Sequence, residues 1–161
     1  MFWDKAAGFY DVVMKLRNGR GNDAFCMAVA ERIDAEDDVL ECACGTGLLT
    51  VRLAEKCRSL IATDYSEGML TQARKKCAAF SNVRIEACDI TKLPYADESF
   101  DKAAAANVIH LLDNPQQAMK ELMRVCKPGG MVILPTYVNR QRTGESGLFI
   151  RVLSRLGAGF R

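Results

Sequence analysis

Residues 39–47 read VLECACGTG, a short and mainly apolar run that passes directly into a turn containing Gly45 and Gly47. A short apolar run that ends at a turn is typical of a buried strand. The residues that follow, 48–57, have the apolar spacing of a helix. The stretch therefore predicts a strand, a glycine turn and a helix in succession, which is the repeating unit of sheets built from parallel strands.

The same unit recurs on the C-terminal side of this stretch. Ser66 is expected to cap a helix that runs to about residue 79, and Asn114 followed by Pro115 predicts the start of a helix that ends at Cys126. Further strands are expected at residues 59–63, 83–88, 101–106 and 131–137. This alternation predicts an α/β protein with a doubly wound, Rossmann-like parallel sheet of about five strands.

Helices are also expected on both sides of this core. Two should precede the first strand, one over residues 2–15 and one that is capped by Asn22 and runs toward Ile33. A third is expected at residues 146–156. Because no repeat or linker composition interrupts the chain, we expect a single domain over residues 1–161.

Composition argues against several classes of protein. The 161 residues are 49% hydrophobic and 26% charged with a net charge of +2, which fits one ordinary domain and disfavours a nucleic-acid-binding protein. No apolar stretch approaches the ~20 residues of a membrane span, so we expect none. The seven cysteines lack Cys-x-x-Cys spacing and the chain has one histidine, so we expect no metal site and a reducing, cytoplasmic location.

Acidic residues follow or end three of the expected strands. Ligands of open α/β sheets bind beyond the carboxyl ends of the strands, and Glu41, Asp64 and Asp89 lie at such ends. A carboxylate at the position of Asp64 can accept two hydrogen bonds from a ribose diol. Glu41 lies beside the glycine turn, where an anion would repel a pyrophosphate. The pattern favours a nucleoside ligand that carries positive charge.

The glycine turn lacks the marks of two common nucleotide sites. In the frame of the dinucleotide fingerprint the three glycine positions are Ala43, Gly45 and Leu48, so the third glycine is missing. The chain also contains no Gly-Lys-Ser/Thr sequence, so a P-loop is excluded. A nicotinamide-dependent oxidoreductase stays an alternative, although no Tyr-x-x-x-Lys pair is present.

Five segments, in order, resemble the class I S-adenosylmethionine-dependent methyltransferases. They are residues 39–47, 63–70, 88–89, 93–101 and 126–130. The opening Trp3-Asp4 and Tyr10-Asp11 pairs are similar to the small-molecule branch that includes the ubiquinone and menaquinone biosynthesis methyltransferases. The resemblance implies methyl transfer from S-adenosylmethionine to a small-molecule acceptor by in-line displacement, with S-adenosylhomocysteine as product. A protein that binds either nucleoside without turnover is the other alternative.

The resemblance also implies roles for single residues and segments. It places Asp64 on the ribose, Asn107 opposite the methyl group, and Tyr10 in a helical lid formed by residues 1–35. The cofactor-binding core is then residues 36–137, and residues 138–161 begin a C-terminal segment. The turn around the methionine part is formed by Glu41, Ala43, Gly45, Thr46 and Gly47, and the adenine contacts are Tyr65, Met69, Cys88, Asp89 and Ile90.

Two further features carry expectations. His110, the one histidine, is predicted to act as a base or to orient the substrate, and the alternative is a helix-start residue packed on its neighbours. The chain departs from the family where Ala43 replaces the first glycine and where it stops at Arg161, before a pair of antiparallel strands. We therefore expect about two strands to be missing, an uncovered fifth strand, and a homodimer formed through that edge.

Overall fold

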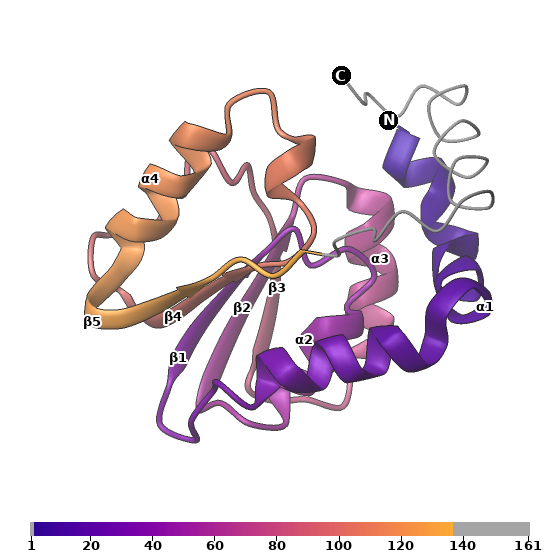
Figure 1. Ribbon diagram of the computed structural model, residues 1–161, viewed down its shortest axis with the longest axis horizontal. Helices are drawn as coiled ribbons and strands as arrows, with labels where there is room; N and C mark the ends of the chain where they lie inside the picture. The colour runs from indigo at the N-terminus through magenta and orange to yellow at the C-terminus, as the bar shows by residue number, and fades with distance from the viewer. Residues whose placement is uncertain (1, 137–161) are drawn as a thin grey trace.

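The computed structural model describes residues 2–136, without the side chains of residues 17–20. The helix expected at residues 146–156 lies outside the described residues. The elements, in order, are α1 (Phe2–Ala30), β1 (Asp38–Cys42), α2 (Leu48–Ala54), β2 (Ser59–Asp64), α3 (Glu67–Lys76), β3 (Val83–Ala87), β4 (Phe100–Ala105), the 3₁₀ turn η1 (Ile109–Leu111), α4 (Pro115–Val125) and β5 (Cys126–Ile133). Strands and helices alternate after α1, as predicted, except that β3 is followed by β4 without a helix between them (Figure 1).

The five strands form one parallel sheet in the order β3-β2-β1-β4-β5. The chain first builds outward from β1 through β2 to β3, then crosses to β4 on the other side of β1. This reversal beside β1 opens a crevice at the carboxyl ends of the strands, where ligands of such sheets bind. The predicted doubly wound α/β fold is confirmed.

Helices cover both faces of the sheet because neighbouring residues of each strand point to opposite faces. Val39 faces the second half of α1 together with α2, and Leu40 faces α4. Ala62 of β2 packs on α3, which lies on the same side as α1 and α2 (Figure 1). The sheet is therefore buried between α1, α2 and α3 on one side and α4 on the other.

Two of the three predicted N-caps, Ser66 and Asn114, are confirmed. The Ser66 hydroxyl accepts a hydrogen bond from the backbone N–H of Met69 at 3.3 Å. The Asn114 side chain accepts one from the N–H of Gln117 at 3.1 Å, and Pro115 occupies the first helical position, where its missing N–H has no cost. Local chemistry thus determines where α3 and α4 begin.

The N-terminal region differs from the two helices that the sequence predicts. The backbone stays helical from Phe2 to Ala30, and Figure 1 shows that α1 changes direction sharply along its length. The Asn22 side chain caps no new helix, and its Nδ2 donates to the Met14 carbonyl at 3.0 Å. Eight residues of a straight helix rise about 12 Å, so this hydrogen bond requires a bend.

The fifth strand also differs from the prediction of residues 131–137. It begins at Cys126, so the Lys-Pro-Gly-Gly sequence lies inside β5. The pairing shifts there, because Phe100 lies opposite Cys126 while Lys102 lies opposite Met131. Proline and glycine are tolerated in a strand at such an irregularity. No helix of the described residues is both long enough and apolar enough to cross a membrane.

Helix α1 also packs closely on the start of α3. The Asp4 carboxylate accepts hydrogen bonds from the Ser66 hydroxyl at 2.6 Å and from the Gly68 N–H at 3.0 Å. The first of these is the main cause that lowers the pKa of Asp4 to about 2. A Cβ on Gly68 would lie 2.7 Å from the Asp4 Cα, a distance at which the backbone must move.

Replacing Gly68 with Ala should therefore push α1 away from α3. We expect a loss of about 1–3 kcal/mol in the free energy of unfolding, as for other overpacked sites, measured by denaturant titration. Gly8→Ala is the matched control, because a Cβ there would meet nothing within 4 Å. Alanine at that helical position should be neutral or slightly stabilising. Equal effects of the two substitutions would contradict the close packing.

Candidate functional site

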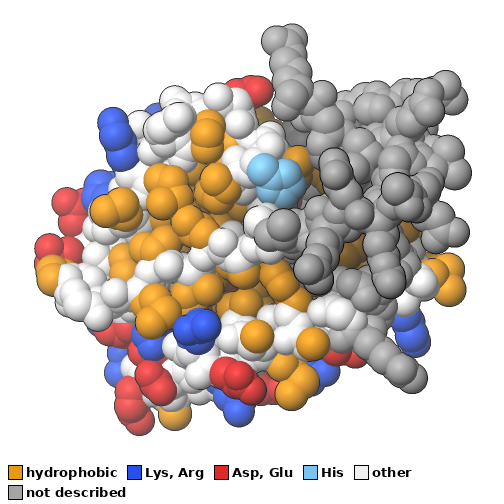
Figure 2. Space-filling view, viewed as in Figure 1, with side chains coloured by type: hydrophobic (Ala, Val, Ile, Leu, Met, Phe, Trp, Pro, Cys, Tyr) orange, Lys and Arg blue, Asp and Glu red, His pale blue; other side chains and the backbone are white. Residues whose placement is uncertain are grey.

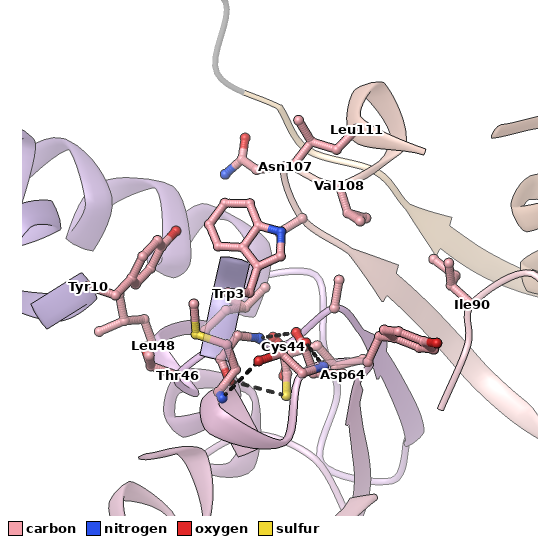
Figure 3. A pocket seen from close by; sticks show the side chains of 18 of the residues that line it. Trp3, Tyr10, Cys44, Thr46, Leu48, Asp64, Ile90, Asn107, Val108 and Leu111 are labelled. Carbon is pink, nitrogen blue, oxygen red and sulfur yellow. Dashed lines mark hydrogen bonds between the residues drawn. The ribbon is translucent and has the colours of Figure 1, made fainter. Parts of the chain in front are cut away.

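A cavity of about 420 Å³ lies at the carboxyl ends of the central strands. Its walls come from α1, the turn between β1 and α2, the ends of β2 and β4, and the segment that contains η1 (Figure 3). The predicted site residues that line it are Tyr10, Glu41, Ala43, Gly45, Thr46, Asp64, Tyr65, Met69, Cys88, Asp89, Ile90 and Asn107. The fold thus brings together residues from five separate segments of the chain, as the position of ligands at strand ends predicts.

In the turn between β1 and α2, every second residue has a backbone conformation in the left-handed region. Ala43, Gly45 and Gly47 have φ angles of 55°, 55° and 85°. A side chain in this region costs roughly 1–2 kcal/mol, so Ala43 is strained where a glycine would not be. A Cβ on Gly45 would meet nothing within 4 Å, whereas one on Gly47 would lie 3.2 Å from the Ala73 Cα. Gly45 therefore keeps the cavity open, while Gly47 lets the turn pack on α3.

The Asp64 carboxylate, at the end of β2, holds this turn in place. Its Oδ2 accepts a hydrogen bond from the Gly45 N–H at 2.8 Å, and its Oδ1 accepts one from the Ser66 N–H at 2.9 Å. Burial raises the pKa of Asp64, and the backbone hydrogen bonds act in the opposite direction. Each carboxylate oxygen can accept more than one hydrogen bond, so these contacts leave acceptor capacity for ligand hydroxyls.

Glu41 is the most unusual polar group that borders the cavity. Glu41 is only 2% exposed, and its Oε2 accepts no hydrogen bond of ordinary geometry among the described residues, although the Thr50 hydroxyl interacts with the carboxyl and acts to lower its pKa. Burial raises the pKa of Glu41 to about 8. A buried carboxyl oxygen without a partner is costly, and a cation in the cavity would supply the missing interaction. The group therefore fits a ligand with a positive charge, as the sequence suggests.

Apolar side chains form the rest of the wall. Trp3, Tyr10 and Met14 contribute from α1, and Val108 and Leu111 contribute from the segment after β4. The rings of Trp3 and Tyr10 meet edge to face, with centroids 6.3 Å apart. Figure 3 shows Trp3 between Tyr10 and the Asn107–Val108 segment. The cavity thus combines an acidic floor with apolar walls.

The predicted adenine contacts lie together along one side of the cavity. Met69 is almost fully buried, whereas Tyr65 is 66% exposed and lies at the rim. Asp89 forms a turn of its own, because its Oδ1 accepts hydrogen bonds from the Thr91 N–H at 2.8 Å and the Thr91 hydroxyl at 2.7 Å. These residues are suitably placed for a planar base, but Asp89 also has a local structural role.

Asn107 and His110 have different positions relative to the cavity. Asn107 lies two residues after the end of β4 and has a left-handed φ of 54°. It donates its N–H to the Pro135 carbonyl and lines the cavity. His110 lies on η1 with its side chain on the surface, and its Nδ1 is 3.4 Å from the Thr136 hydroxyl (Figure 2). It is absent from the lining residues, as is Gly47. The catalytic role of His110 stays a prediction without support from this geometry.

The sequence reasoning did not assign roles to several residues that the structure brings to the site. Trp3, Met14 and Phe25 line the cavity from α1. Asp4 and Asp11 connect α1 to α3 and to the glycine turn. The two acids are seven residues apart, which is two helical turns, so their shared helix face was a signal in the sequence.

A family described as "Methyltransferase domain" matches residues 40–134, which run from β1 to the end of β5. The chain belongs to this family. The match includes every strand end that borders the cavity of this methyltransferase domain. The resemblance to class I S-adenosylmethionine-dependent methyltransferases is confirmed, and S-adenosylmethionine is the cofactor of that family. The roles of single site residues stay predictions.

The relatives of this methyltransferase domain agree with that assignment. The chain is 32% identical over 135 residues to a demethylmenaquinone methyltransferase of Clavibacter sepedonicus, which covers 82% of this chain and 55% of that protein. It is 36% identical over 103 residues to a ubiquinone/menaquinone biosynthesis C-methyltransferase of Bdellovibrio bacteriovorus, which covers 62% of this chain and 44% of that protein. The chain thus spans about half the length of the curated relatives it matches.

A solved structure gives the same result. A SAM-dependent methyltransferase from Thermotoga maritima superposes with a TM-score of 0.72 at 25% identity, covering 99% of this chain and 70% of that chain. The Rossmann-like methyltransferase fold predicted from the sequence is confirmed.

Replacing Glu41 with Gln should remove a pH dependence of stability. Burial raises the pKa of Glu41 from 4.5 to about 8, so between these values the folded protein keeps a proton that the unfolded chain has lost. The stabilising effect of that proton is complete below pH 4.5 and is lost as the pH rises through about 8. Thermal unfolding across this range should show Glu41→Gln gaining stability relative to the wild type as the pH rises.

The control for this experiment is Glu31→Gln, which removes an exposed carboxyl group outside the cavity. Its difference from the wild type should not change with pH in the same range. A constant difference between Glu41→Gln and the wild type would contradict a buried, protonated Glu41.

Proposed function

We propose that the chain is the cofactor-binding part of a methyltransferase that transfers a methyl group to a small, largely apolar acceptor. The observation that carries the proposal is the buried Glu41 carboxyl, whose Oε2 has no partner among the described residues and which borders a cavity with mainly apolar walls. A sulfonium nucleoside with an amino-acid tail has cations that could meet Glu41, and ribose hydroxyls that could use the acceptor capacity left on Asp64. The names of the relatives suggest a quinone-type acceptor that is methylated on carbon.

Each part of the cofactor has a candidate set of residues in the cavity. Glu41 would accept a hydrogen bond from the cationic part of the cofactor, and Asp64 would accept hydrogen bonds from its ribose hydroxyls. The side chains of Tyr65, Met69 and Ile90 would contact its base. Bound there, S-adenosylmethionine would supply a methyl group on a sulfonium, from which the neutral thioether of S-adenosylhomocysteine is a good leaving group. The cofactor assignment fits these residues because the unsatisfied acceptors and the apolar wall match its chemistry.

The residues around the cavity can promote the reaction by alignment and by exclusion of water. Trp3 and Tyr10 on one side and Leu111 on the other present apolar surface toward the reaction space. Holding two reactants in line can lower the activation free energy by about 7–11 kcal/mol. We therefore assign positioning and desolvation to this part of the chain. A proton-transfer role for His110 is a separate prediction.

A second candidate is a protein that binds the cofactor or its demethylated product without turnover. The strained Ala43 in the turn is the observation that favours it, because a left-handed alanine adds a methyl group beside the cavity. Binding alone cannot separate the two candidates. Transfer of a labelled methyl group to demethylmenaquinol, the acceptor that the relatives suggest, would support the enzyme.

We also propose a molecular setting for this site. Residues 1–161 would form one methyltransferase-like domain with residues 1–35 as its lid. The packing of the second half of α1 on the sheet supports the single domain, and Trp3 and Tyr10, which line the cavity from the first half, support the lid. All seven cysteines are free thiols, as expected in the cytoplasm. β5 lies at one edge of the sheet, and Figure 2 shows hydrophobic side chains on that face, which supports a homodimer through this edge.

Calorimetric titration with S-adenosylmethionine and with S-adenosylhomocysteine tests the proposed function. The wild type should bind both, and Asp64→Asn should weaken binding by about tenfold to a hundredfold, as expected for lost charged hydrogen bonds. Thermal unfolding without ligand must show that the variant is folded, because Asp64 also holds the turn. Asp113→Asn is the control at an exposed carboxylate outside the cavity lining.

Two results would contradict the proposal. One is a folded wild-type chain that binds neither nucleoside. The other is an Asp64→Asn variant with unchanged affinity, which would remove the ribose site from the end of β2. Protection from thermal unfolding by NAD instead of S-adenosylmethionine would favour the oxidoreductase alternative.

A further inference from the structure

Two carboxylates attach the first part of α1 to opposite ends of α3. Asp4 lies at the N-terminus of α3, where its carboxylate accepts hydrogen bonds from the Ser66 hydroxyl and the Gly68 N–H. Asp11, two turns later, lies at the other end, and its Oδ2 accepts a hydrogen bond from the Lys76 ammonium group at 2.6 Å. Asp4 and Asp11 therefore fix both the position and the direction of this part of α1 beside α3.

Asp11 makes a further contact that Asp4 does not make. Its Oδ1 accepts a hydrogen bond from the Thr46 hydroxyl at 2.5 Å, and the Lys76 Nζ lies 3.5 Å from the same hydroxyl. Thr46 is 1% exposed and belongs to the glycine turn, beside Gly45. One carboxylate thus connects α1, the turn between β1 and α2, and the end of α3.

The position of Asp11 is electrostatically unfavourable without a neighbouring cation. The C-terminus of a helix carries partial negative charge, so an acid beside the end of α3 is repelled. Lys76 is the last residue of α3 and supplies the compensating charge. Asp4 needs no such help, because it lies at the positive end of the same helix. Asp11, Thr46 and Lys76 are therefore expected to act as one unit.

This unit connects the two walls of the cavity. Tyr10, which precedes Asp11, lines the cavity from α1, and Thr46 lines it from the turn. The Gly45 N–H on the other side of Thr46 is bonded to Asp64. Movement of α1 away from the cavity must therefore break the Asp11–Thr46 hydrogen bond before the two walls can separate.

We infer that Asp11 is a positioning residue that couples the lid helix to the cofactor-binding turn through Thr46. The inference rests on the proposed function, since it assigns to Asp11 a share of the affinity for the cofactor without direct contact. When the contact is lost, α1 separates more readily from the turn and the bound nucleoside dissociates faster. Asp4 holds the same helix but does not reach the turn, so its loss should not have this effect on the turn.

A double-mutant cycle on Asp11 and Thr46 tests the inference. Asp11→Asn and Thr46→Val should each weaken S-adenosylhomocysteine binding by about tenfold, mainly through faster dissociation, since each removes a hydrogen bond to a charged group. The affinity of the double variant for S-adenosylhomocysteine should be no lower than that of the single variant that binds less tightly. Lys76→Met should weaken binding in the wild-type background but not in Asp11→Asn. Asp23→Asn, an exposed acid on the same helix, is the control and should bind as the wild type does.

A second readout does not depend on a ligand. Hydrogen exchange without ligand should speed up at the amides of residues 45–47 in Asp11→Asn, while Asp4→Asn should affect the start of α3 and leave those amides unchanged. A purely structural anchor would give the same exchange pattern in both variants. Additive affinity losses in the cycle, or unchanged exchange in the turn, would overturn the inference. A wild type that binds neither nucleoside while Asp11→Asn still loosens the turn would overturn only the proposed function.

Discussion

The hydrogen bonds of the Asp64 carboxylate are the constraint on which the site depends. They join the end of β2 to Gly45 in the glycine turn and to Ser66 at the start of α3. The glycine turn carries Thr46, which donates a hydrogen bond to Asp11 of α1. Ser66 donates a hydrogen bond to Asp4 of the same helix. A single half-buried carboxylate thereby sets the spacing of three segments that border the cavity, before any ligand enters.

Much of the fold could be predicted because its signals are local. The apolar run at residues 39–42 and the caps at Ser66 and Asn114 depend on neighbours a few residues away, and each is found where expected. The errors come from interactions between distant residues. The bend that keeps Asn22 inside α1 and the irregular pairing that extends β5 back to Cys126 both depend on the partners that the fold supplies.

The site divides in the same way. The rule that ligands bind at the ends of parallel strands was enough to select Glu41 and Asp64, because the topology alone brings those ends together. It could not find the role of Asp11, whose partners Thr46 and Lys76 are 35 and 65 residues away along the chain. Nor could it place His110, because the 3₁₀ turn η1 decides which way that side chain points.

The acids around the cavity differ in role because their surroundings differ. Asp11 and Asp64 have hydrogen-bond partners in the protein, and through these bonds they hold the scaffold. Glu41 is as deeply buried as the core, yet one of its oxygens has no partner among the described residues. The fold therefore retains an unfavourable group at the floor of its cavity, and a bound cation would offset its cost. That linkage makes ligand binding and the stability of this domain two measures of the same interaction.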